Sequence, residues 1–198
     1  NIGALARSFQ EIQSRHEPLR TLYRTVDDQP VQEIVEDATL EVKVIDLSAP
    51  APEQQEAEVR HLIKEEAERT FDLSRDWPLR VTLLQLAPQR NILLLTMHHM
   101  ASDGWSVDVL FKELTSVYQA YSRGQPSPLP ALSVQYADYA SWQRQMMQGP
   151  VLDQQLEYWR RQLDGAPAIL DLPTDRLRPT QQTSRGQRQH FHIDAKIV

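Results

Sequence analysis

The spacing of apolar residues in the first part of the chain changes between the period of a helix and that of a strand. Leu5, Phe9 and Ile12 recur at helical spacing, which predicts an amphipathic helix from residue 3 to about residue 16. Pro18 ends this helix, because the residue before a proline avoids the helical region. Strands are predicted for the shorter runs at 19–26, 31–35 and 40–47, with a turn at 27–30.

The middle of the chain predicts a second helix and a hairpin. The helix lies within 48–71, with its apolar face formed by Val59, Leu62, Ile63 and Ala67. The runs at 77–87 and 92–97 predict two antiparallel strands. The second of these strands is apolar on both faces, so we expect it in the middle of a covered sheet.

After Gly104 the pattern returns to the helical period. A helix is expected from Trp105 to Ser122, ending at Gly124. A proline-rich connector follows, and then helices at 134–147 and 152–165. Because helices and antiparallel strands are mixed, we expect an α+β fold in which helices cover a mostly antiparallel or mixed sheet.

Composition narrows the class of protein. Hydrophobic residues make up 40% of the 198 residues and charged residues 24%, as in soluble globular domains. The net charge of -6 argues against nucleic acid as a partner, and no apolar run approaches the roughly 20 residues that span a membrane. The chain has no cysteine, which excludes disulfides, thiolate zinc sites and a cysteine nucleophile and fits a cytoplasmic location.

The candidate chemistry lies in the stretch "LTMHHMASDGWS", at the end of the predicted buried strand. His98 and His99 are adjacent, and neighbouring side chains on a strand point to opposite faces, so we expect no metal site here. Two interpretations stay open. His99 is a satisfied core histidine beside a tight turn at Asp103 and Gly104, or it transfers protons, for which an ordinary pKa of about 6.5 is suitable.

Several stretches resemble one family. "HHMASDGWS" resembles the His-His-x-x-x-Asp-Gly motif of condensation domains of nonribosomal peptide synthetases, enzymes of secondary metabolite biosynthesis. The shorter His-x-x-x-Asp-Gly pattern is shared with chloramphenicol acetyltransferase and other coenzyme-A-dependent acyltransferases. "RHEPLRTLYR" (15–24), "YADYASWQR" (136–144) and the crossover "LPTDRLRPTQQTSRG" are similar to further motifs of the condensation family, with Tyr23 in place of its phenylalanine.

This resemblance implies a fold and its division. Residues 1–165 would form the amino-terminal lobe of a chloramphenicol-acetyltransferase-like fold, slightly trimmed at its start. Residues 166–187 would be a crossover linker, and 188–198 the first strand of a missing carboxy-terminal lobe. The chain starts within an expected helix and ends within an expected strand, so we expect a fragment of a longer protein.

The resemblance also implies roles for the motif residues. His99 would be the general base or would orient the attacking amine, and Asp103 would be chiefly structural, paired with Arg20. Gly104 would serve the backbone conformation and bring its N–H close to the reacting carbonyl. His98 would pack or support the site.

Two aromatic side chains and a further histidine are expected to stabilise the fold rather than to bind a ligand. Trp142 and Tyr139, at helical spacing, are expected in the core rather than against a ligand. His16 is expected to cap the end of its helix.

The implied reaction joins a donor aminoacyl or peptidyl thioester to the amino group of an acceptor aminoacyl thioester. The domain would bind no cofactor or metal itself, since its substrates are carried on the phosphopantetheine of carrier domains. Expected partners are the upstream donor and downstream acceptor carrier domains, an adjacent adenylation domain and the missing lobe, with no nucleic acid and no membrane.

The type of activity stays open in three respects. The resemblance is nearest to domains that join an L-configured donor to an L-configured acceptor, but a dual epimerisation/condensation type also fits. A coenzyme-A-dependent acyltransferase of the same superfamily is a second possibility, and a non-catalytic docking lobe is a third. We expect little or no turnover from the fragment alone.

Overall fold

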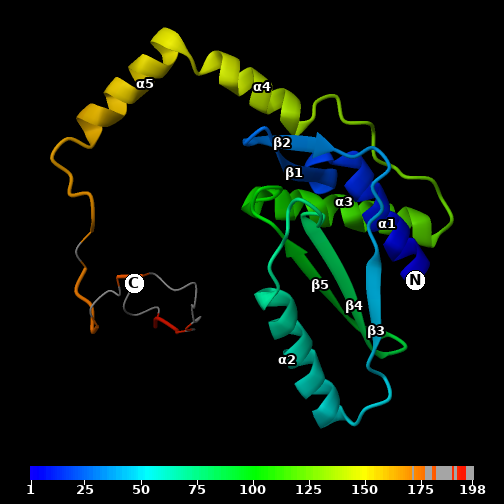
Figure 1. Cartoon of the computed structure of the whole chain (residues 1–198). Helices are drawn as coiled ribbons and strands as arrows, with labels where there is room; N and C mark the ends of the chain where they lie inside the picture. The colour runs from blue at the N-terminus through cyan, green and yellow to red at the C-terminus, as the bar shows by residue number, and fades with distance from the viewer. Residues whose placement is uncertain (171, 177–179, 182–188, 190, 195–198) are drawn as a thin grey trace. The chain divides into compact units, whose positions relative to one another are not determined.

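The structure is a computed structural model that describes residues 1–170, 172–176, 180–181, 189 and 191–194. The chain divides into two compact units, Asn1–Gln148 and Gly149–Val198, which are described separately. The elements of the first unit, shown in Figure 1, are α1 (Ile2–Arg15), the 3-10 turn η1 (Glu17–Arg20), β1 (Thr21–Val26), β2 (Gln29–Ile34), β3 (Val42–Asp46), α2 (Pro52–Glu68), β4 (Leu79–Ala87), β5 (Arg90–Met97), α3 (Gly104–Ser122) and α4 (Tyr136–Met146). The second unit contains α5 (Gly149–Gln162).

A three-stranded mixed sheet organises the first unit. Its order is β3-β4-β5, with β3 parallel and β5 antiparallel to β4. The predicted hairpin of β4 and β5 is confirmed. The expectation that β5 lies in the middle of the sheet is wrong for the described residues: β4 is central, because the parallel β3 pairs with its free side, as at Val42 and Val81.

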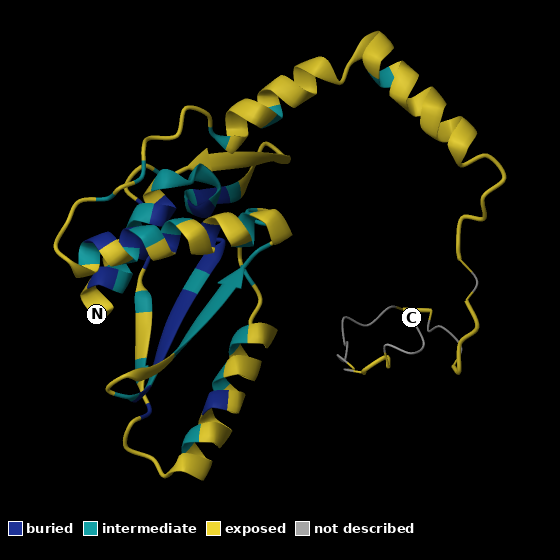
Figure 2. Cartoon of the chain, turned by 180° about the vertical axis from the view of Figure 1, so that it is seen from behind, coloured by how far each residue is buried: buried dark blue, intermediate teal, exposed yellow. Residues whose placement is uncertain are grey.

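Helices cover both faces of this sheet, because alternate side chains of β4 enter two separate cores. Leu79 and Val81 pack with buried residues of α1 and α3, which lie side by side in both views. Leu84 and Leu86 pack with Val59 of α2. Figure 2 shows β4 as the most buried strand. The α+β class predicted from the sequence is confirmed.

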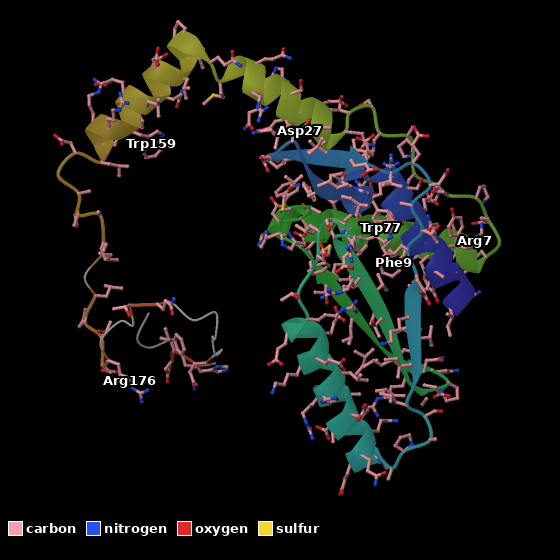
Figure 3. The ribbon with its side chains drawn as sticks, viewed as in Figure 1. Arg7, Phe9, Asp27, Trp77, Trp159 and Arg176 are labelled. Atoms are coloured by element: carbon pink, nitrogen blue, oxygen red, sulfur yellow. The ribbon has the colours of Figure 1, made fainter. Side chains whose placement is uncertain are left out.

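Phe9 of α1 and Trp77, which precedes β4, help to hold the larger core together. Phe9 is fully buried, and Trp77 packs against the same cluster while its indole N–H donates to the Thr39 carbonyl at 3.0 Å. Figure 3 labels both residues close to the region where α1 meets the sheet. The first predicted helix and its burial are therefore confirmed.

The buried face of α2 differs in part from the predicted one. Val59 and Leu62 face the sheet, whereas Ile63 and Ala67 are exposed. Glu66 is half-buried instead and forms an ion pair with Arg80 at 2.7 Å. A charged side chain therefore occupies part of the face that apolar spacing alone assigns to Ile63 and Ala67.

Two turns follow the local sequence closely. β1 and β2 are joined by Asp27 and Asp28, whose φ angles of 50° and 58° are typical of a two-residue type I′ hairpin. The helix α3 ends before Gly124, which adopts φ 70° as predicted for a terminating glycine. No helix in the described ranges is both long and apolar enough to cross a membrane.

The later part of the chain is described only in part. The predicted helices at 134–147 and 152–165 correspond to α4 and α5. Of the expected crossover at 166–187 and the expected strand at 188–198, residues 171, 177–179, 182–188, 190 and 195–198 lie outside the described residues, and the described ones belong to no helix or strand. That division of the chain stays a prediction.

Candidate active site

A six-residue turn, His98–Asp103, connects the edge of the sheet to α3. β5 ends at Met97 and α3 begins at Gly104, so the motif residues lie where an apolar strand gives way to an amphipathic helix. The His98 N–H donates to the Pro78 carbonyl at 2.8 Å, which extends the pairing with the chain preceding β4. The Ala101 N–H then donates to the His98 carbonyl at 3.0 Å and closes the turn.

His98 is half-buried and packs within this turn. Its ring lies 5.6 Å from that of Phe71, with the planes at 81°. Its Nδ1 accepts the Met100 N–H at 3.1 Å, and its carbonyl also accepts the Ser102 hydroxyl at 3.3 Å. These contacts agree with the packing or supporting role that the sequence suggested.

His99 is exposed and lines a solvent-facing hollow of about 140 Å³. We call this space the His99 hollow. Its other lining residues are Pro18, Met100, Ala101, Ser102, Asp103, Ser106 and Tyr136. The structure therefore leaves the imidazole accessible, as a proton-transfer role requires, rather than enclosing it as a core histidine. Its catalytic role stays a prediction.

Asp103 is the N-cap of α3. Its Oδ1 accepts the Ser106 N–H at 2.8 Å and the Ser106 hydroxyl at 2.7 Å, while the Ser106 Oγ accepts the Asp103 N–H at 3.2 Å. These hydrogen bonds lower the pKa of the Asp103 carboxyl below its ordinary value, and a positive charge on nearby His99 lowers it further. The carboxylate is therefore held ionised beside the imidazole.

The expected ion pair between Asp103 and Arg20 is wrong in the part of the chain that the structure describes. Arg20 donates to the carbonyls of Ser14 and Val35 at 3.1 and 3.0 Å and lies 3.6 Å from the Glu17 carboxylate. The physical reason is that the guanidinium closes the junction between α1, η1 and β2. Asp103 finds its donors locally, three residues along the chain.

Gly104 is not required by backbone conformation. Its φ is not in the left-handed region, and a Cβ built on it would have nothing within 4 Å. Gly104 is the first residue of α3 and does not form a tight turn with Asp103, so that expectation is wrong. The space in front of it remains open on the exposed side of the turn.

Trp142 and Tyr139 do not lie in a core. They are 53% and 43% exposed, and their rings lie 5.7 Å apart on α4. The helical spacing correctly places them on neighbouring positions, but α4 has no buried residue in the described chain. The prediction of a core role is therefore wrong, and Trp142 is not brought to the turn by any described contact.

A second hollow adjoins the first and was not predicted. This apolar hollow, of about 230 Å³, shares Pro18, Ala101, Ser102, Ser106 and Tyr136 with the His99 hollow. His16 lines it and is, as predicted, the C-cap of α1. The His16 Nε2 lies 2.7 Å from the carboxylate of Glu113, which also pairs with Arg15 at 3.2 Å.

Other residues that support the turn were also missed. The sequence analysis assigned no role to Phe71, Arg80 or Ser106. Of these three residues, only Ser106 could have been identified from the local sequence. Asp is a preferred N-cap residue, and here the serine three residues later returns a hydrogen bond to it. Within the described ranges, no three His, Cys, Asp or Glu side chains gather as they would to hold a metal ion.

Comparison with known sequences gives a consistent set of relatives. The profile of the family described as "Condensation domain" matches residues 1–198. A subunit of the linear gramicidin synthase of Brevibacillus parabrevis is 41% identical over 198 residues, covering 100% of this chain and 4% of that protein. Phosphinothricin tripeptide synthetase PhsC of Streptomyces viridochromogenes is 39% identical over 197 residues, covering 100% of this chain and 18% of that protein. The chain thus spans a small part of the length of these relatives.

Solved structures show the same arrangement. The X-domain from teicoplanin biosynthesis superposes with a TM-score of 0.78 at 29% identity, covering 90% of this chain and 39% of that structure. The epimerization domain from the third module of tyrocidine synthetase B gives a TM-score of 0.77 at 25% identity, with 90% and 40% covered.

Proposed function

The chain belongs to the condensation-domain family, and from this premise we propose that it contributes the histidine side of an amide-bond-forming active site. The chloramphenicol-acetyltransferase-like α+β fold expected from the motifs is confirmed by the structural relatives. The chain covers only part of the length of each relative. The reaction, its substrates and its partners are therefore part of what we propose.

The reaction joins two thioester-bound groups. The α-amino nitrogen of the acceptor attacks the carbonyl carbon of the donor thioester, and a C–N bond forms as the C–S bond breaks. The proton lost by the amine passes to the departing thiolate. Since a thioester is already activated, the domain has to position both groups, keep the amine neutral and stabilise the oxyanion.

The accessibility of His99 supports this proposal most strongly. The imidazole lies on a turn that is tied to Pro78 at one end and to α3 at the other, and it faces an open hollow. An imidazole in this position can accept the amine proton and deliver it to the thiolate, or hold the amine toward the carbonyl. Asp103, whose carboxylate Ser106 holds in the ionised form, lines the same hollow.

The substrates and partners follow from the same family membership. We infer that donor and acceptor groups arrive on the phosphopantetheine arms of two carrier domains and that an adenylation domain lies next to the complete condensation domain. The absence of cysteine agrees with a reducing, cytoplasmic location.

The test measures the product of the full-length synthetase polypeptide that carries this chain. Donor and acceptor carriers are loaded with aminoacyl groups, and the new peptidyl thioester is quantified by mass spectrometry. We expect product on the acceptor carrier. Product formed only from free acyl-coenzyme A would favour the coenzyme-A-dependent acyltransferase, and no product from either donor would favour the docking lobe; either result contradicts the proposal.

A further inference from the structure

The contacts behind the turn point to positioning residues that lie far from the His-His motif in sequence. We propose that Phe71 and Arg80 form, with Glu66, a packed column that holds His98 and thereby sets where His99 projects. This inference rests on the proposed function, because the position of His99 matters to turnover only if His99 takes part in the reaction.

The column begins with a half-buried ion pair between α2 and β4. The Arg80 Nε lies 2.7 Å from the Glu66 Oε1, and these side chains are 12% and 16% exposed. The same guanidinium donates to the carbonyls of Arg69 and Thr70 at 2.8 and 3.1 Å, just beyond the end of α2. Arg80 therefore uses its planar group of donors to hold the chain that leads to Phe71.

Phe71 lies between Arg80 and His98. The Arg80 Cζ is 3.8 Å from the centre of the Phe71 ring, within the roughly 6 Å at which a cation is attracted to an aromatic face. The Phe71 ring in turn meets the His98 ring at 5.6 Å and 81°, a perpendicular geometry that aromatic pairs prefer. A cation and two rings thus connect the end of α2 to the turn.

His98 transmits this support to its neighbour. Its N–H, carbonyl and Nδ1 bind Pro78, Ala101 and Met100, so three of its polar atoms fix the backbone on both sides of His99. Because Nδ1 accepts the Met100 N–H, the neutral ring carries its proton on Nε2. Rotation of the His98 ring would break this bond and release the residue that follows His99.

Removal of the aromatic ring tests the column. Phe71→Leu keeps apolar volume but loses the cation–π and ring contacts, and Phe71→Tyr restores the ring. Phe111→Leu is the matched control, since Phe111 is 48% exposed on α3 and takes part in no ring or cation–π contact in the described chain. Nitrogen-15 NMR of the chain reports the His98 tautomer and the Met100 amide. Peptide formation by the full synthetase reports kcat and KM.

In Phe71→Leu, we expect the His98 ring to become a mixture of tautomers, the Met100 amide resonance to shift, and kcat to fall about ten- to hundredfold while KM changes little. Phe71→Tyr should recover the tautomer and most of kcat, and Phe111→Leu should match the wild type. An unchanged tautomer and unchanged kcat in Phe71→Leu would overturn the inference while leaving the proposed function intact. Absence of product from the wild type would instead overturn the proposed function, and with it any catalytic consequence of the column.

Discussion

Asp103 and Ser106 hold each other across the first turn of α3. The Asp103 carboxylate accepts both the N–H and the hydroxyl of Ser106, and the Ser106 Oγ accepts the Asp103 N–H in return. This reciprocal cap satisfies N–H groups that a helix start leaves without partners. It also keeps Asp103 in the lining of the His99 hollow, so the helix start and the candidate site are built from the same contacts.

Loss of the cap should change the titration of Asp103. In Ser106→Ala, we expect the pKa of the Asp103 carboxyl to rise toward its ordinary value of 3.8, because the hydrogen bond that the Ser106 hydroxyl donates to the carboxylate, which favours the ionised form, is lost. Carbon-13 NMR of the carboxyl measures this pKa. Asp72, whose pKa is lowered by hydrogen bonds from Ser74, is an internal control that should not change.

The same variant predicts a dependence of stability on pH. The folded Asp103 has a lowered pKa, so its contribution to stability is present above the ordinary value of 3.8 and is lost as the pH falls through the folded-state pKa. The melting temperature of Ser106→Ala should therefore lie below that of the wild type at neutral pH, and the gap should narrow in acid. A gap that stays constant from pH 7 to pH 2 would show that the carboxylate is not responsible.

Gly104→Ala separates folding from chemistry. The added methyl group meets no atom within 4 Å, and alanine is the better helix former, so we expect the melting temperature to stay equal or to rise. Peptide formation should fall, because the methyl group fills part of the open space in front of Gly104, where the resemblance brings the reacting carbonyl close to the Gly104 N–H. A loss of stability would show that the glycine is needed by the fold, contrary to its geometry.

The contacts of the Glu113 carboxylate with Arg15 and His16 should stabilise the folded state. Each side chain keeps only 12–25% of its exposure, so Glu113→Gln should lower the free energy of unfolding by about 2 kcal/mol, less than the roughly 3–5 kcal/mol for a fully buried pair. Urea unfolding measures this loss. Glu56→Gln is the control, because Glu56 pairs with Arg60 on an exposed helix face and should cost under about 0.5 kcal/mol. Equal losses in the two variants would contradict this account.

Local periodicity predicted much of this fold, because the elements it describes depend on near neighbours. The helix around Phe9, the Asp27–Asp28 turn and the end of α3 at Gly124 each follow from spacing or from backbone preferences of single residues. The central position of β4 could not be predicted in this way. It depends on β3, which pairs with β4 from across the whole of α2.

In the candidate site, too, local features were predictable from the sequence and long-range contacts were not. Of the two interpretations that the sequence leaves open for His99, its exposure rules out the core histidine, and His98 packs against Phe71. The partner predicted for Asp103 is wrong. The resemblance implies a long-range ion pair with Arg20, whereas the carboxylate caps the start of α3. Phe71 and Arg80 could not be found from sequence spacing, since their contacts join three segments that meet only in the folded chain.

The central claim is that His99 acts on the amine of the acceptor. The most direct test is the rate of peptide formation by the full synthetase carrying His99→Ala, measured with preloaded carriers beside a circular dichroism spectrum of the variant. We expect the rate to fall by about 10²–10⁴-fold with an unchanged spectrum, because the exposed imidazole supports no described contact of the fold. A rate equal to that of the wild type would contradict the account.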